Sequence, residues 1–412
     1  MADFYSLESS PKGECIVYLE EYEKNYDGKI DVLYIDFRQY KDMYLYSQAI
    51  GYGADSDASF IELRNLKTSK RLRRGCYYKL NLDLLKHFQQ EEKSQQEDSY
   101  LIGAVYDLVD MPIPNNDQEE MLQSHQTLDS RELSMANVPF GEIEGELFGN
   151  IERDNLSLFV KNVDQANWNE LRSNGAIKVL YDAGAALRAS KTDVDAIINS
   201  RMKDLIDSKP VLVISHWDMD HIHCLIAMSD SDIKNYFSKI VCPDKLKSNM
   251  SKAILGKLQA ALGNANVFCL PLPGRTNGIT MQLWKDEGCI SIYQGESSTQ
   301  PNYCGLVMFV RGRNKSANYT GDCRLSQADD VYTQEINGGL STNEHVLIAP
   351  HHGGDCGPMH RHYSTPCDII AISVGANNRY GHPNGDMLKY LRSLGNVKRT
   401  DDDGGMDITE TL

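Results

Sequence analysis

Four side chains of the kinds that bind divalent metal ions stand close together in the chain. They are His216, Asp218, Asp220 and His221, and they follow the apolar run Val211–Ile214. Such a run predicts a buried β-strand, whose end delivers these side chains at the rim of a sheet. Imidazole nitrogens and carboxylate oxygens are ligands of zinc and manganese. The spacing favours a metal site over the alternative, an acidic surface loop after a strand.

Three more segments place similar residues after apolar runs. In the first, Gly321 allows a tight turn that presents the carboxylate of Asp322. In the second, His351 and His352 follow a predicted strand, and in the third His382 lies in the loop after another. Loops at one edge of a sheet can meet although they lie far apart in the chain, so we expect a single dinuclear site. Its predicted ligands are His216, Asp218, Asp220, His221, Asp322, His351 and His382.

Individual roles follow from the residue types. A carboxylate between two metal ions bridges them, and Asp322 suits that position. Adjacent side chains at a strand end diverge, which favours His351 as the ligand and His352 as a proton donor or a group behind the ligands. Asp220 is predicted to serve catalysis as well as metal binding. His223, in contrast, is predicted to be a hydrogen-bonded helix residue rather than a ligand.

The loop that contains His382 also offers groups for a substrate. The guanidinium of Arg379 matches the oxygens of a phosphate, and Tyr380 or His352 would assist the leaving group. Asn377 and Asn378 are further predicted substrate-binding residues. The alternative for Asn377, Asn378 and Arg379 is that they only build a turn, since asparagine tolerates left-handed backbone geometry.

These segments together closely resemble the metallo-β-lactamase fold superfamily, whose first motif is His-x-His-x-Asp-His. Here Asp218 replaces the second histidine. With this replacement, and with the Gly-Asp, His-His-Gly and Asn-Arg-Tyr-Gly-His-Pro segments, the chain looks like the hydrolase domain attached to the competence protein ComEC. The resemblance covers residues 150–412 and includes Val163-Asp164-Gln165, Asp182-Ala183-Gly184 and Arg399-Thr400-Asp401.

The resemblance implies an α/β fold, the αββα sandwich of metallo-β-lactamase-like proteins. It also implies a phosphodiesterase or nuclease with two divalent metal ions, zinc or manganese. No histidine occurs between His223 and His345, so the third-motif histidine of many relatives is missing. Together with Asp218, this makes the predicted site richer in oxygen and shifts its preference from zinc towards manganese or mixed occupancy.

The predicted function is therefore metal-dependent hydrolysis of a phosphodiester, in a nucleic acid or a nucleotide, by a metal-activated hydroxide. One alternative is hydrolysis of a lactone, thioester or β-lactam carbonyl by the same site, because fold does not fix function. A second alternative, of another class, is a non-catalytic metal-binding or sensory protein.

The chain divides into three predicted regions. Short runs rich in Tyr, Val and Ile predict an N-terminal, mainly β accessory domain over residues 1–110, a candidate surface for a protein partner. Residues 111–149 combine proline, asparagine and acidic residues and predict a linker or mobile insertion. Residues 150–412 alternate predicted strands with helices, among them Asp193–Ile206 and Lys245–Leu262, and predict the hydrolase domain.

Composition narrows the class further. The 412 residues carry a formal net charge of -16, which argues against broad binding to duplex nucleic acid but not against a nuclease. The basic run Lys67–Arg74 predicts a solvated hairpin edge, with a nucleic-acid contact as the alternative. No apolar run is long enough to cross a membrane, and the N-terminal residues do not resemble a secretion signal, so we expect a cytoplasmic protein. The 10 cysteines are scattered singly and predict reduced core thiols.

Overall fold

The computed structural model places two compact units, Met1–Leu133 with Lys247–Leu255, and Ser134–Leu246 with Gly256–Leu412. The residues that it describes are 14–24, 30–38, 42, 60–64, 76–81, 102–104, 146–149, 151–187, 189–246, 248–273, 281–296, 298, 301–342, 344–354, 356, 363, 366–376, 378, 380–402 and 405–412. The basic run Lys67–Arg74 lies outside the described residues, as does most of the predicted linker.

The described part of the first unit contains a five-stranded sheet in the order β4-β1-β2-β3-β5. Its strands are β1 (Glu14–Lys24), β2 (Ile30–Phe37), β3 (Phe60–Arg64), β4 (Cys76–Asn81) and β5 (Ile102–Ala104). The pairs are antiparallel except β3 with β5. Val17, Leu33 and Phe37 are buried on this sheet.

The second unit is built on two seven-stranded sheets. The first has the order β11-β10-β9-β8-β7-β6-β19, and the second has the order β12-β13-β14-β15-β16-β17-β18. The first contains β6 (Leu156–Val160), β7 (Asn169–Ser173), β8 (Ala176–Tyr181), β9 (Val211–Val213), β10 (Lys239–Pro243), β11 (Val267–Leu270) and β19 (Ile408–Thr411). The second contains β12 (Met281–Glu287), β13 (Ile290–Gly295), β14 (Leu306–Arg311), β15 (Lys315–Tyr319), β16 (Glu344–Ile348), β17 (Cys367–Ile372) and β18 (Gly395–Arg399).

The two sheets pack face to face. Leu158 and Val179 of the first sheet share one buried cluster with Ile292, Met308 and Val346 of the second. The other face of the second sheet is covered by α9 (Leu325–Asn337) and α10 (Gly385–Leu394), which share a second buried cluster with it. Alternate residues of a strand point to opposite faces, so β13, β14, β16 and β17 each supply both clusters.

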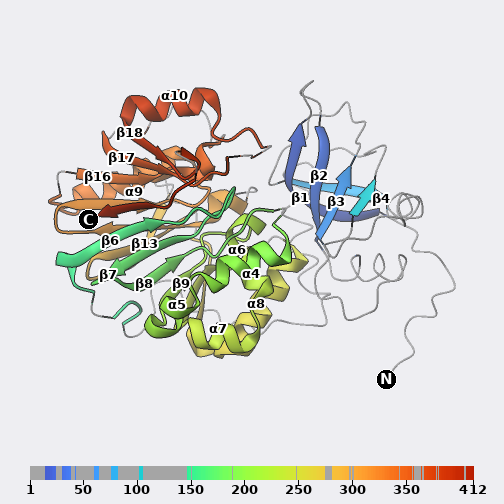
Figure 1. Ribbon diagram of the computed structural model, residues 1–412, viewed down its shortest axis with the longest axis horizontal. Coiled ribbons are helices and arrows are strands. Elements are labelled where there is room, and N and C mark those ends of the chain that lie inside the picture. The colour runs from blue at the N-terminus through green and yellow to red at the C-terminus, as the bar shows by residue number, and fades with distance from the viewer. Residues whose placement is uncertain are drawn as a thin grey trace. The chain divides into compact units, whose positions relative to one another are not determined.

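Helices also cover the outer face of the first sheet. They are α4 (Lys191–Asn199), α5 (Met202–Ser208), α6 (Met219–Ala227) and α7 (Asp230–Tyr236), and Figure 1 shows them beside β7, β8 and β9. The order of layers is therefore helix, sheet, sheet, helix, which confirms the predicted αββα arrangement of an α/β protein.

Helix boundaries differ from the predicted ones. The predicted helix Asp193–Ile206 is two helices, α4 and α5, with a break at Ser200 and Arg201. The first begins at a capping box in which Ser190 and Asp193 bond each other's backbone N–H groups. The helix predicted from Lys245 is α8 (Asn249–Leu262). No helix in the described residues is long and apolar enough to cross a lipid bilayer.

Residues at the end of the predicted linker belong to the packed core. Leu147 and Phe148 are buried in the cluster between the sheets. Their backbone N–H groups donate to the carboxylate of Glu287 over 2.8 and 2.9 Å. A charged acceptor for two amides fixes this segment to β12, so it is part of the sandwich.

A buried histidine behind the second sheet gives this fold a pH dependence. Burial lowers the pKa of His345 to about 3, and its ring nitrogens lie 2.9 Å from Ser316 Oγ and 2.6 Å from the Tyr363 hydroxyl. The unfolded chain binds a proton at His345 below about pH 6.5, where the folded chain does not. Stability is therefore lost as the pH falls from about 6.5 towards 3, by up to about 1.4 kcal/mol per pH unit.

We expect His345→Gln to flatten this dependence, because glutamine carries no titrating group. The measurement is the free energy of urea unfolding of metal-free protein from about pH 4 to about pH 7. The variant should lose less stability than the wild type on acidification. Equal slopes for the two proteins would contradict a neutral buried His345.

Candidate metal centre

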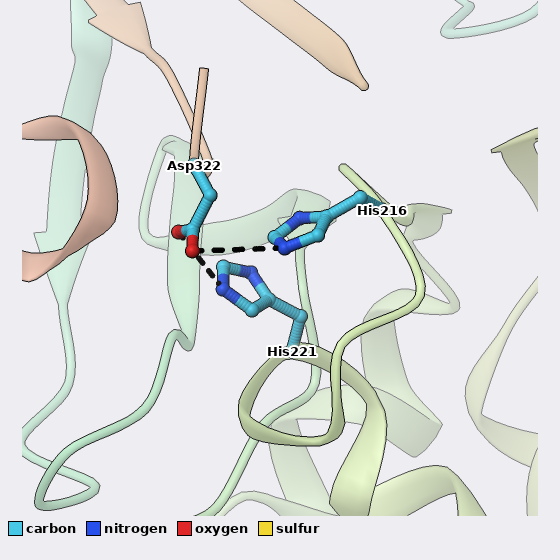
Figure 2. Close-up of side chains that lie close together, drawn as sticks. All are labelled: His216, His221 and Asp322. Carbon is cyan, nitrogen blue, oxygen red and sulfur yellow. Dashed lines mark ion pairs between the residues drawn. The ribbon is translucent and has the colours of Figure 1, made fainter. Parts of the chain in front are cut away.

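The ligand-type residues lie where strands of both sheets end. His216 follows β9, and Asp322 follows β15 of the facing sheet. Figure 2 shows the two imidazoles of His216 and His221 directed at the carboxylate of Asp322. Nε2 of His216 lies 3.7 Å from Oδ2 of Asp322, and Nε2 of His221 lies 3.1 Å from Oδ1. Parallel strands with their carboxyl ends at one rim bring these distant residues together.

The N-terminus of α6 presents the rest of the first segment. Asp218 is the N-cap residue with extended backbone, and Asp220 and His221 occupy the first turn. Nε2 of His221 lies 3.7 Å from Oδ1 of Asp220. Carboxylates in the first turn are favoured by the positive end of the helix dipole. The helix start thus gathers three of the predicted ligands.

Two overlapping groups have a geometry suited to a metal ion, with all ligand atoms of each group within 4.8 Å of one another. The first group is His216, His221 and Asp322, and the second is Asp220, His221 and His352. Nε2 of His352 lies 3.2 Å from Oδ2 of Asp220. His352, predicted to stand behind the ligands, is therefore placed among them.

The other predicted ligands border these groups. Asp218 Oδ2 lies 3.4 Å from Nε2 of His216, and Nε2 of His351 lies 3.5 Å from Oδ2 of Asp322. The ring of His382 lies 5.1 Å from that of His351 and 6.5 Å from that of His352, between centroids. The structure therefore brings all seven predicted ligands to one rim.

Both adjacent histidines reach the cluster because of an unusual backbone. His351 and His352 each have φ of 53°, in the left-handed region that costs a non-glycine residue about 1–3 kcal/mol. This turn abolishes the divergence expected of two neighbours at a strand end. Gly354 follows this turn and leaves room for the His382 ring, since a Cβ at Gly354 would lie 2.3 Å from Cε1 of His382.

The loop after β17 is braced by Asn378. Its side-chain Nδ2 donates to the carbonyl oxygens of Gly375 and His382 over 3.0 and 2.7 Å, and its Oδ1 accepts from the His382 N–H. This geometry matches the turn-building alternative for Asn378. Tyr380 is partly buried in the same loop. Asn377 and Arg379 lie outside the described residues.

A buried carboxylate behind the ligands orients two imidazoles. Oδ2 of Asp182 lies 2.8 Å from Nδ1 of His221 and 2.8 Å from Oγ of Ser215. Ser215 Oγ in turn lies 2.9 Å from Nδ1 of His216. Protons on both Nδ1 atoms satisfy this network, which leaves both Nε2 atoms as lone-pair donors towards the cluster. The Asp-Ala-Gly segment after β8 was the sequence signal for Asp182, whereas its contact with His221 required the fold.

His352 is oriented in the same manner. Its Nδ1 lies 2.8 Å from the carbonyl oxygen of Ser373, which accepts the Nδ1 proton. Nε2, which lies 3.2 Å from Oδ2 of Asp220, is therefore the nitrogen that could bind a metal ion. His223, one turn along α6, instead pairs its Nδ1 with the carbonyl of Ala186 at 3.1 Å, as expected of a hydrogen-bonded helix residue.

The charges of the cluster perturb its pKa values strongly. Burial would raise the pKa of Asp322, but His351, His221 and His216 hold it well below its usual range. Burial would lower the pKa of His221, but Asp322, Asp182 and Asp220 raise it well above its usual range. A buried carboxylate whose pKa stays low remains negatively charged and attracts cations. Divalent ions would displace the protons of the histidines.

Unsatisfied polar atoms show that the residues fit metal ions. Nε2 of His216, Nε2 of His221 and Oδ1 of Asp322 are buried, and none makes a hydrogen bond of normal geometry within the described residues. Buried polar groups without partners are rare in folded proteins and require an explanation. These three atoms form the first group, and divalent cations bound beside them would supply that explanation.

The role of Asp182 gives a test of ligand orientation. We expect Asp182→Asn to weaken metal binding about 10- to 100-fold, the usual cost of losing a carboxylate behind a metal-bound histidine. Asparagine fits the left-handed backbone of Asp182, whose φ is 63°. Its amide, however, is uncharged and can present an NH2 group to Nδ1 of His221 in place of an accepting oxygen. Titration calorimetry with manganese and zinc measures the change. Unaltered affinity would contradict the role given to Asp182.

Comparison with known protein families gives no match to a family model. Among curated proteins, triosephosphate isomerase of Xanthobacter autotrophicus is 27% identical over 117 residues, which span 27% of this chain and 46% of the isomerase. The chain thus matches less than half the length of this curated relative.

Several solved structures align with about three fifths of the chain. A metal-dependent hydrolase of the β-lactamase superfamily is 10% identical with a TM-score of 0.37 and covers 63% of this chain and 100% of its own. The metallo-β-lactamase fold protein YhfI of Bacillus subtilis is 10% identical with a TM-score of 0.37, at 62% and 100% coverage. The short form of human tRNase Z is 11% identical with a TM-score of 0.30, at 61% and 98% coverage.

Strand order and packing define the fold of the second unit. The second unit has two facing mixed sheets with helices outside and a His/Asp cluster at their common rim. This combination is the α/β sandwich that the resemblance to metallo-β-lactamase-like proteins implies, with a site suited to metal ions.

Proposed function

We propose that the second unit is a metal-dependent hydrolase of phosphodiester bonds, a phosphodiesterase or nuclease. The observation that carries the proposal is the buried group His216, His221 and Asp322, whose facing atoms lack hydrogen bonds of normal geometry within the described residues. The resemblance of its His-x-Asp-x-Asp-His motif to the ComEC-type hydrolase domain supports a phosphodiester rather than a carbonyl substrate.

We assign the ligands to two positions. His216, Asp218 and Asp322 would hold one ion, and Asp220, His221 and His352 would hold the other, with Asp322 between them. The short distances of Asp322 to both His216 and His221 support its bridging position. The carboxylates make both positions rich in oxygen, which supports manganese over zinc.

When bound, the two ions would activate a water molecule and stabilise the charge that builds on a phosphoryl oxygen. The protein holds the ligands rigidly, since Asp182, Ser215 and Ser373 fix the imidazole rings from behind. Nδ1 of His352 contacts the carbonyl oxygen of Ser373, and Nε2 faces Asp220 within the second group. We therefore assign His352 to metal binding instead of proton transfer. His351, whose side chain is 17% exposed, and Tyr380 are the candidates to protonate a leaving group.

The test compares substrates of the two chemistries. Purified protein with manganese should hydrolyse bis-p-nitrophenyl phosphate, and it should leave nitrocefin and simple lactones intact. Asp220→Ala should remove this activity and lower the metal content, while Asp207→Ala, on the exposed surface of α5, should preserve both. Turnover of the carbonyl substrates alone would overturn the phosphodiester assignment. Bound metal without turnover of any ester would favour a binding or sensory protein.

A further inference from the structure

An asparagine that the sequence motifs do not include touches two of the predicted ligands. Nδ2 of Asn302 lies 3.2 Å from Oδ2 of Asp218 and 3.4 Å from Oδ2 of Asp322. Asp218 comes from the loop after β9 and Asp322 from the loop after β15, so Asn302 joins ligands of the two facing sheets. Both carboxylates also lie near Nε2 of His216.

The chemistry of an amide suits this place. Its –NH2 group offers two donors, and ionised carboxylates only accept. One asparagine therefore bonds both carboxylates at once and fixes the distance between them. An imidazole in the same place would add a nitrogen ligand, whereas the amide leaves the position beside His216 dominated by oxygen.

The segment that carries Asn302 is fixed directly to the first ligand segment. Asn302 lies in the short 3-10 helix η3 (Pro301–Cys304), just before β14. The N–H of Leu306 donates to the carbonyl oxygen of Ser215 over 2.8 Å. A Cβ on Gly305 would lie 2.9 Å from that same oxygen and 3.6 Å from Cβ of His216, so only glycine allows this approach.

A second anchor holds η3 from the side of α9. Nε2 of Gln327 donates to the carbonyl oxygen of Tyr303 over 2.8 Å, and the guanidinium of Arg324 lies 4.0 Å from the centre of the Tyr303 ring. Gln327 and Arg324 belong to the start of α9, directly after Asp322. The backbone of residues 303–306 is thus bound to both ligand segments that the Asn302 side chain contacts.

We propose that Asn302 is a positioning residue that holds Asp218 and Asp322 as metal ligands and sets the preference of the position beside His216 for manganese over zinc. The inference rests on the metal site of the proposed function. It extends that site by a residue from a third loop, and it explains how two like charges are kept close together before an ion binds.

The experiment measures metal affinity, without any substrate. Chelator-treated wild type, Asn302→Leu and Asn302→His are titrated with manganese and with zinc by calorimetry. Leucine keeps much of the volume of asparagine but lacks the amide. We expect Asn302→Leu to bind manganese about 10- to 100-fold more weakly, as for other groups behind metal ligands. Asn302→His should raise the ratio of zinc to manganese affinity by about tenfold or more.

Matched controls are Asn396→Leu and Asn396→His, on the exposed side of β18 at the strand end away from the site. They should bind both metals like the wild type. The melting temperature of each metal-free variant reports whether it folds. If Asn302→Leu does not fold, the ratio of zinc affinity to manganese affinity in Asn302→His alone tests the role of Asn302.

The outcomes separate this inference from the proposed function. Altered metal affinity in the Asn302 variants of a protein that hydrolyses nothing supports the inference and overturns the proposed hydrolase. Wild-type affinity and wild-type metal ratio in both variants of an active hydrolase overturn the inference alone. Absence of metal binding by the wild-type protein overturns both.

Discussion

Asp322→Asn is expected to lower phosphodiester hydrolysis at least about a thousandfold, or about 4 kcal/mol in the barrier. Asp322 contacts His216, His221 and His351 within 3.7 Å. His221 belongs to both candidate groups, so Asp322 adjoins the second group through it. Asparagine has nearly the same shape but no charge, so the cluster loses the carboxylate between its imidazoles. The variant should also lose the rise in melting temperature that added manganese gives the wild type, because that rise depends on binding to the folded state.

Rates and melting curves of the two proteins, with and without manganese, measure this prediction. Asp207→Asn is the matched control, since it makes the same change on the exposed surface of α5. It should retain both activity and stabilisation by metal. An Asp322→Asn protein with wild-type rate and wild-type metal response would show that the bridging position is assigned to the wrong residue.

Gly184→Ala is expected to lower the free energy of unfolding by about 3 kcal/mol or more, or to prevent folding. A Cβ on Gly184 would lie 1.8 Å from the carbonyl oxygen of Asp220 and 2.8 Å from that of Asn167. Both are backbone atoms, which cannot turn aside as a flexible side chain can. Any protein that folds must displace the start of α6, so it should bind metal more weakly as well.

Urea unfolding and metal titration of the same preparation measure both effects. Gly385→Ala is the control, because its added Cβ would meet nothing within 4 Å at the start of α10. Alanine there should be neutral or stabilising by up to about 1 kcal/mol. Equal stability of the two variants would mean that the segment after β8 does not pack against α6 as described.

Much of the fold was predictable because its strands are continuous apolar runs. The strand predicted at Val211–Ile214, for example, corresponds to β9. Strands such as β12 and β15 give a weaker sequence signal, since polar residues interrupt them and their burial depends on the facing sheet. The break between α4 and α5 was missed, because the apolar spacing continues across it.

The candidate site was predictable where ligands follow strands and less so where geometry decides. The ligand-type residues from His216 to His382 could be read from motif spacing, and they meet at one rim. The left-handed turn at His351 and His352 could not be predicted from the sequence, because nothing about the two histidines indicates a positive φ. Asn302 had no signal at all, since it approaches Asp218 and Asp322 only through the packing of η3 against both ligand segments.

The central claim is that imidazoles and carboxylates from both sheets hold two divalent ions at one rim. Anomalous diffraction from crystals of the protein grown with manganese tests it most directly. We predict two peaks, one beside Nε2 of His216 and Oδ2 of Asp322 and one between Asp220, His221 and His352. Manganese absent from both positions, or bound only at other residues, would contradict the account.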